Sequence, residues 1–172
     1  NASWTTVNPS FLGIVADVQV EFKLARKTNT GACTSGITRT YTTSTNDDSG
    51  NDQVQAVYDE HGNWPGNKYL NIFVVNEANG AAGYTNYPSN ATSTLMSNGI
   101  KILHTYCGGI GTGYPSYATA LSHEVGHWLN LRHCWGNSNY PGCDGTDFSN
   151  PGCDGDDNCD FDDQVTDTPN SI

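Results

Sequence analysis

The chain has 172 residues, 35% of them hydrophobic, which fits one domain with a single hydrophobic core. Its net charge of −11 excludes nucleic acid as an expected partner, because binding to phosphate requires clustered Lys and Arg. No hydrophobic run approaches the roughly 20 residues that a membrane-spanning helix needs, so we expect no membrane association.

Most of the chain before residue 117 is predicted to form a small sheet with long loops. Strands are expected where β-branched and aromatic side chains cluster or alternate with polar ones, and loops where Gly, Ser, Thr and Asn dominate. In chain order, the predicted elements are a half-buried strand over 15–24, a loop over 28–51, a short helix around 53–58, a central strand over 69–75, an edge strand over 80–88 and a further strand over 100–107.

Residues 117–129 predict one strong amphipathic helix. Its hydrophobic face is formed by Ala118, Leu121, Val125 and Leu129. His123 and His127 project from nearly the opposite side, so the helix can pack on a sheet and present both imidazoles to a cleft. After Asn130 the pattern stops. Residues 134–172 are predicted to be loop-rich and to need disulfides or metal ions for order.

The cysteines favour a secreted, extracellular protein. There are six, an even number, and none forms a CxxC pair, which disfavours zinc fingers and thioredoxin-like sites and favours a disulfide-stabilised exported domain. Their pairing is left open. They are Cys33, Cys107, Cys134, Cys143, Cys153 and Cys159.

Acidic residues concentrate at the C-terminal end, where residues 144–172 contain no Lys or Arg. Oxygen-bearing side chains occur there at alternate positions, a spacing that allows a loop to converge on Ca²⁺. They are Asp154, Asp156, Asn158 and Asp160. Cys159 occupies the place of the Gly that an EF-hand requires, so this is not that motif. A plain acidic surface is the alternative explanation.

The stretch from His123 to His133 carries the clearest chemistry. His123 and His127 are four residues apart on the predicted helix, within reach of one Zn²⁺, and Glu124 can face a metal-bound water. His133 reaches the same ion only if the helix ends sharply in a left-handed residue, and Asn130 is the next most tolerant type after Gly. Three His ligands leave a fourth position for water, as catalytic zinc sites do.

Histidines and tryptophans outside this pattern are assigned structural roles. A single His in a globular chain is most often a hydrogen-bonded or surface residue, and we place His61 and His104 in that class. Trp128 and Trp135 are expected to pack around the site rather than to contact substrate.

The motif HEVGHWLNLRH resembles the extended zinc signature of the metzincin metallopeptidases, HExxHxxGxxH, with Asn130 in place of the usual Gly. The segments FKLARKT, GITRTYT, WPGNKYLNIFVVN, AAGYTNYP, HEVGHWLNLRHCWG and DDQVTDTPN resemble the pappalysin family, which includes ulilysin-like enzymes and fungal secreted proteases. The resemblance implies an α+β, metzincin-like fold: a twisted mixed β-sheet, an active-site helix and a loop-rich C-terminal part. It also implies structural calcium and places residues 80–88 near a substrate-binding edge strand.

The chain departs from the pappalysin pattern at its end. Family members carry a methionine-containing turn after the DTP sequence, whereas the only Met here is Met96, upstream of the motif. We therefore expect an incomplete catalytic domain over 1–172, with an upper subdomain containing the zinc helix (1–133) and the start of a lower subdomain (134–172). A second fragment of the same precursor is a candidate partner.

The sequence thus predicts a secreted zinc endopeptidase that hydrolyses protein or peptide substrates with a zinc-bound water activated by Glu124. One alternative is a calcium-dependent binding or adhesion module, which explains the acidic tail but not the placement of Glu124 and Asn130. The other is a metzincin fragment that binds zinc but is inactive.

Overall fold

The computed structural model describes residues 9–11, 13, 19–43, 54–88 and 98–133. The chain forms two compact units, residues 1–38 and residues 39–172. None of the helices within the described residues is both long and apolar enough to span a membrane. Cys33 and Cys107 are free thiols, so the structure shows no disulfide among the residues that it describes. The other four cysteines lie outside them.

The first unit contains a short 3₁₀ helix, η2 (Pro9–Phe11), and an isolated antiparallel bridge between Lys27 and Cys33. The strand predicted over 15–24 is wrong over its described part, 19–24, which forms no strand. The side chains of Val20, Phe22 and Leu24 are 51%, 54% and 62% exposed. Alternating hydrophobic residues become a half-buried strand only when a neighbouring strand pairs with them, and no described strand does so here.

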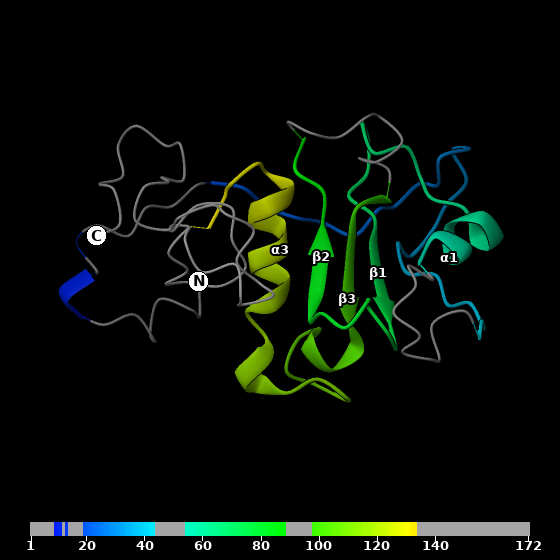
Figure 1. Cartoon of the computed structure of the whole chain (residues 1–172). Helices are drawn as coiled ribbons and strands as arrows, with labels where there is room; N and C mark the ends of the chain where they lie inside the picture. The colour runs from blue at the N-terminus through cyan, green and yellow to red at the C-terminus, as the bar shows by residue number, and fades with distance from the viewer. Residues whose placement is uncertain (1–8, 12, 14–18, 44–53, 89–97, 134–172) are drawn as a thin grey trace, which may run out of the picture. The chain divides into compact units, whose positions relative to one another are not determined.

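The second unit contains a three-stranded mixed sheet: β1 (Ile72–Val75), β2 (Gly83–Thr85) and β3 (Ile100–Leu103), in the order β1-β3-β2 (Figure 1). β1 pairs with β3 in parallel, and β2 pairs with β3 antiparallel. The predicted mixed sheet is thus confirmed, and the strand within residues 80–88 lies, as expected, at an edge of the sheet that the described residues form. The prediction of a central strand over 69–75 is wrong, because β3 is central and β1 lies at an edge of the described sheet.

The strand predicted over 100–107 is shorter than expected. β3 ends at Leu103, and His104–Tyr106 form the 3₁₀ helix η4. Leu103 pairs with Val75, the last residue of β1, and β2 reaches β3 no further than Ile102. Both neighbours therefore stop where β3 stops, and among the described residues the chain beyond has no strand to pair with.

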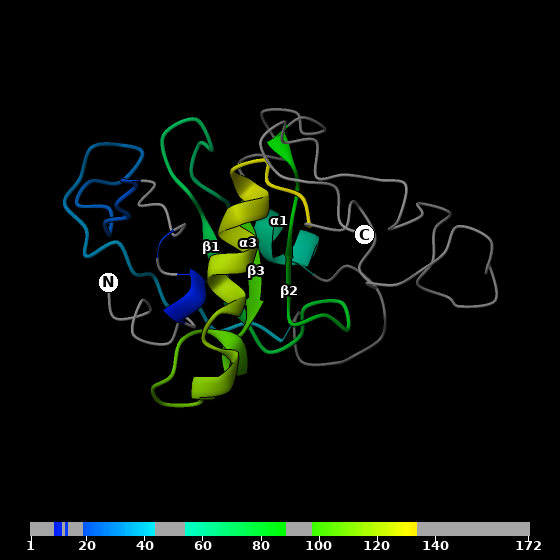
Figure 2. The same ribbon diagram turned by 90° about the vertical axis from the view of Figure 1, so that its left-hand side faces the viewer.

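Two helices lie on opposite faces of the sheet (Figures 1 and 2). α1 (Val54–His61) confirms the predicted short helix, and α3 (Ala120–Trp128) confirms the strong one. α3 packs over β2 and β3. Tyr117, the predicted first residue of this helix, instead ends the 3₁₀ helix η5 (Pro115–Tyr117).

The buried centre of this unit is the middle strand. Ile100 and Ile102 are fully buried on the face that α3 covers. Lys101 is only 2% exposed, and its side chain lies on the other face. Its Nζ is 5.0 Å from the ring centroid of Tyr58 in α1 and 4.8 Å from that of Tyr84 in β2. These cation–π contacts stabilise a charge that burial alone would disfavour.

Candidate metal centre

The C-terminal end of α3 sets the direction of the chain toward the site. The main-chain nitrogen of Leu131 donates to the oxygen of Gly126 at 2.9 Å, and that of Asn130 donates to His127 at 2.9 Å. This pair of hydrogen bonds is a Schellman motif, which requires a left-handed residue directly after the helix cap. Asn130 supplies it with a φ of 72°, which confirms the predicted left-handed residue.

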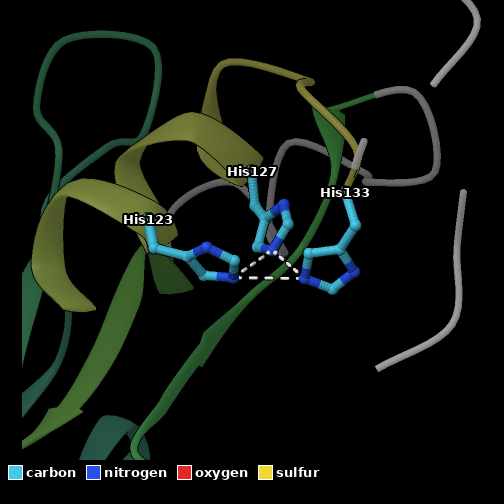
Figure 3. A group of neighbouring side chains, drawn as sticks. All are labelled: His123, His127 and His133. Atoms are coloured by element: carbon cyan, nitrogen blue, oxygen red, sulfur yellow. Dashed lines mark hydrogen bonds between the residues drawn. The ribbon is translucent and has the colours of Figure 1, made fainter. Parts of the chain in front are cut away.

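The three predicted histidines come together, His123 and His127 from α3 and His133 from the chain that follows the turn (Figure 3). The Nε2 atom of His127 lies 2.9 Å from that of His123 and 3.1 Å from that of His133, and the latter two are 3.1 Å apart. In tetrahedral zinc sites with Zn–N distances of about 2.0–2.1 Å, nitrogen ligands are roughly 3.3 Å apart. The three donors therefore fit one metal ion, and they are the group within the described residues that could hold one.

The ring of His127 is oriented by the same turn. Its Nδ1 atom lies 2.8 Å from the main-chain oxygen of Leu131. Because a carbonyl oxygen can only accept, we assign the proton of the neutral ring to Nδ1. The Nε2 atom then presents a lone pair to the other two histidines, which is the tautomer that a metal ligand requires.

The environment of His123 favours its neutral form. Burial lowers the pKa of this ring below its ordinary value of 6.5, and His127 and His133 lower it further. Only a neutral imidazole binds a metal ion, so these effects keep the donor available.

Glu124 lies on α3 directly after the first of these histidines and is only 7% exposed. Burial raises the pKa of its carboxyl group from 4.5 to about 7. The side chain packs beneath β2, where a Cβ atom added to Gly83 would lie 3.3 Å from Cγ of Glu124. A glycine at this point of the strand leaves room for the carboxylate. A buried carboxyl group with a pKa near neutrality is suited to proton transfer.

A fifth side chain, which the sequence reasoning missed, contacts the site. The ring centroid of Tyr87 lies 5.1 Å from that of His127, with 70° between the ring planes. Burial raises the pKa of the Tyr87 hydroxyl, Arg132 lowers it and Glu124 raises it. The available signal was the alternation along the predicted edge strand, residues 80–88, which would place every second side chain on one face.

A pocket of about 260 Å³ adjoins the three imidazoles. Its lining consists of the side of α3 that carries the histidines together with the returning chain. These residues are Ser122, His123, Gly126, His127, Leu131, Arg132 and His133.

The remaining predicted residues fall into two groups. His104 lies in η4 and is not part of the histidine group, and Trp128 is half-buried at the end of α3. Trp135, Met96 and the calcium candidates Asp154, Asp156, Asn158 and Asp160 lie outside the described residues.

Residues 48–171 match the sequence profile of the M43 peptidases, described as pregnancy-associated plasma protein-A. The chain is 36% identical over 80 residues to extracellular metalloprotease 1 of Coccidioides posadasii, a match covering 41% of this chain and 29% of that protein. It is 37% identical over 82 residues to an extracellular metalloprotease of Sordaria macrospora, covering 42% of this chain and 28% of that protein. The matched part is less than a third of either relative.

Among solved structures, the chain is similar to mature mirolysin of Tannerella forsythia in complex with a cleaved peptide, with a TM-score of 0.75 and 31% identity. The likeness covers 99% of this chain and 58% of that one. A promirolysin mutant from the same organism matches with a TM-score of 0.73 and 30% identity, over 99% of this chain and 51% of that one. These likenesses confirm the predicted α+β fold with a mixed sheet and a helix beside it.

Proposed function

The chain belongs to the pappalysin (M43) family of metzincin metallopeptidases, and from this premise we propose that it is the zinc-binding catalytic part of a secreted endopeptidase. The observation that carries the proposal is the meeting of three Nε2 atoms within 2.9 to 3.1 Å of one another. The names of the fungal relatives, extracellular metalloproteases, support both the activity and the location.

His123, His127 and His133 would hold the zinc ion. Three imidazoles are a donor set of catalytic zinc sites, in which the fourth position remains open. The geometry supports this role because the donors are already close to the required spacing, and because the hydrogen bond from His127 to Leu131 selects the metal-binding tautomer. Little rearrangement of the histidines is then needed on binding.

When bound, zinc supplies a Lewis acid that makes water a nucleophile at neutral pH. Glu124 would act as the general base that accepts the proton of the attacking water, and then as the acid that returns it to the leaving amine. A carboxyl group with a pKa of about 7 can serve in both directions near neutral pH.

Peptide substrates would bind along β2. This strand pairs with β3 on one side and forms an edge of the described sheet on the other. An extended peptide can add to such an edge through main-chain hydrogen bonds. β2 also runs directly over Glu124, so a peptide beside it would pass near the proposed base. The cleaved peptide in the mirolysin structure is in keeping with this class of substrate.

Structural calcium in the acidic C-terminal segment is part of the proposal, with Asp154, Asp156, Asn158 and Asp160 as its ligands. Metal analysis of the purified chain would report zinc and calcium separately. A stoichiometric zinc content without calcium would remove this part and leave the peptidase proposal in place.

The decisive experiment is digestion of casein and of a peptide library, with and without a zinc chelator, by the wild-type chain and by Glu124→Gln. We expect chelator-sensitive cleavage by the wild type and loss of nearly all cleavage, with zinc retained, in the variant. Undiminished cleavage by Glu124→Gln would exclude Glu124 as the base. Zinc binding without cleavage by the wild type would instead identify an inactive fragment, and absence of zinc would favour a binding module.

A further inference from the structure

We propose that Tyr87 is a positioning residue, which holds the ring of His127 in its metal-binding orientation and so raises the affinity of the site for zinc. The inference rests on the proposed zinc function. The two rings meet edge to face, with centroids 5.1 Å apart and planes at 70°. Aromatic pairs prefer this arrangement. The contact restricts rotation of the imidazole plane about the bond that joins the ring to Cβ.

Tyr87 lies two residues beyond the end of β2, and continued alternation along the chain would place its side chain on the face of the sheet toward α3. Gly83 pairs with Ile102, whose side chain lies on the face that α3 covers. A Cβ atom added to Gly83 would lie next to Glu124, on that same face. Side chains two and four residues further along an extended chain lie on the same face. Thr85 donates from its hydroxyl to the oxygen of Gly99 at 2.8 Å, which fixes the end of β2 before the chain reaches Tyr87.

His127 is therefore held from two directions. Its Nδ1 atom is bound to the oxygen of Leu131 at 2.8 Å, which sets the tautomer and one in-plane direction. The contact with Tyr87 restrains the tilt of the ring plane, which a single hydrogen bond leaves free. Donor groups must be held within about 10–20° of their productive orientation, and such supporting contacts commonly determine whether they are.

The hydroxyl of Tyr87 is not needed for this role, because the contact is between the two rings. Replacement by Phe keeps that contact, whereas replacement by Leu removes it while leaving a hydrophobic side chain. Tyr84 offers a matched control. It lies in β2, three residues before Tyr87, and its side chain faces the opposite side of the sheet, where its ring contacts Nζ of Lys101 at 4.8 Å.

The test measures Zn²⁺ affinity by competition with a chromophoric chelator, and the visible spectrum of the Co²⁺-substituted chain, for Tyr87→Leu, Tyr87→Phe and Tyr84→Leu. We expect Tyr87→Leu to lose roughly 3- to 10-fold in Zn²⁺ affinity, the usual worth of an aromatic pair, and to shift the Co²⁺ bands. Tyr87→Phe and Tyr84→Leu should retain the affinity and the spectrum of the wild type.

Unchanged Zn²⁺ affinity and Co²⁺ bands in Tyr87→Leu would overturn the inference, and so would an equal loss in Tyr84→Leu. If Tyr87→Leu does not fold, Tyr87→Met is read in the same way, because its flexible side chain fills the same space. A wild-type chain that binds no Zn²⁺ would refute the proposed function and this inference together. Normal binding by the wild type with no effect at Tyr87 would refute this inference alone.

Discussion

The Nδ1 atom of His127 lies 2.8 Å from the main-chain oxygen of Leu131, four residues further along the chain. Leu131 also donates its main-chain nitrogen to Gly126, closing the turn that ends α3. One residue thus links the end of the helix to the orientation of a proposed metal ligand. The geometry of the metal centre should therefore depend on the residue that permits the turn.

That residue is Asn130, and its replacement gives a first prediction. With a φ of 72°, Asn130→Ala should cost about 1–2 kcal/mol of unfolding free energy, whereas Asn130→Gly should be neutral or slightly stabilising. The Ala variant should also bind Zn²⁺ more weakly, since the turn positions His133. Urea unfolding of the zinc-free chain and chelator competition measure the two effects. Equal stability and affinity of the Ala and Gly variants would contradict this account.

Removal of the third proposed ligand gives a second prediction. His133→Ala should weaken Zn²⁺ binding by more than the roughly 10- to 100-fold that loss of an outer-sphere partner costs. His104→Ala is the matched control, because His104 lies in η4 and not in the histidine group. Isothermal titration of both variants with Zn²⁺ would decide the matter. Wild-type affinity in His133→Ala would remove His133 from the ligand set.

Gly83 gives a third prediction, about the space above Glu124. A Cβ atom there would lie 2.8 Å from the main-chain oxygen of Lys101 and 3.3 Å from Cγ of Glu124. Gly83→Ala must therefore displace β2 or the carboxylate, and we expect kcat/KM to fall on the order of 10- to 100-fold with zinc retained.

The control for this variant is Gly109→Ala, where the added carbon would meet Pro115 at an ordinary distance of 3.4 Å. Comparable activity of the two alanine variants would show that the space between β2 and the Glu124 carboxylate can hold an added methyl group. A drop in zinc content of Gly83→Ala would place the damage at the ligands instead.

The buried carboxyl group gives a fourth prediction, about stability against pH in the zinc-free chain. The folded state raises the pKa of Glu124 from 4.5 to about 7, so it binds the proton more tightly than the unfolded chain does. The stability of the wild type relative to Glu124→Gln should then be greatest below pH 4.5 and should decline as the pH rises to about 7.

The lowered pKa of His123 acts in both proteins, so the comparison isolates the carboxyl group. Urea midpoints of the two proteins, measured in chelator at several pH values, provide the test. A difference between the proteins that is constant over this range, or that grows with pH, would show that burial does not raise the pKa of Glu124.

The histidine cluster was predictable from the sequence because its determinants are local. Helical spacing alone brings His123 and His127 to one face, and the tolerance of Asn for left-handed backbone indicated the turn. His133 followed from that turn. No contact between distant segments was needed to name these residues.

The sheet was less predictable because its order depends on pairing between distant segments. Residues 69–75 are the most strand-like run in the chain, which suggested a central strand. Yet α3 packs over β2 and β3, and Ile72 and Val74 of β1 are 42% and 53% exposed. Hydrophobicity indicates that a strand forms there, but not which strand another element will cover.

Lys101 and Tyr87 show, for single residues, that the sequence does not predict contacts between different elements. A Lys is ordinarily assigned to the surface, but Lys101 is buried because Tyr58 and Tyr84 come from two different elements to enclose it. The contact of Tyr87 with His127 likewise depends on how β2 lies along α3. Side-chain neighbours across elements are a product of the fold, which the sequence pattern alone does not reveal.

All three imidazole donors lie within eleven consecutive residues, from His123 to His133. The spacing among the donors is thus encoded by one contiguous segment, and loops elsewhere can lengthen or shorten during evolution without altering it. Because all three donors lie in one short segment, that segment does not tolerate an insertion. One extra residue between His127 and His133 would separate the last donor from the other two, whereas several extra residues in a distant surface loop would leave the trio intact.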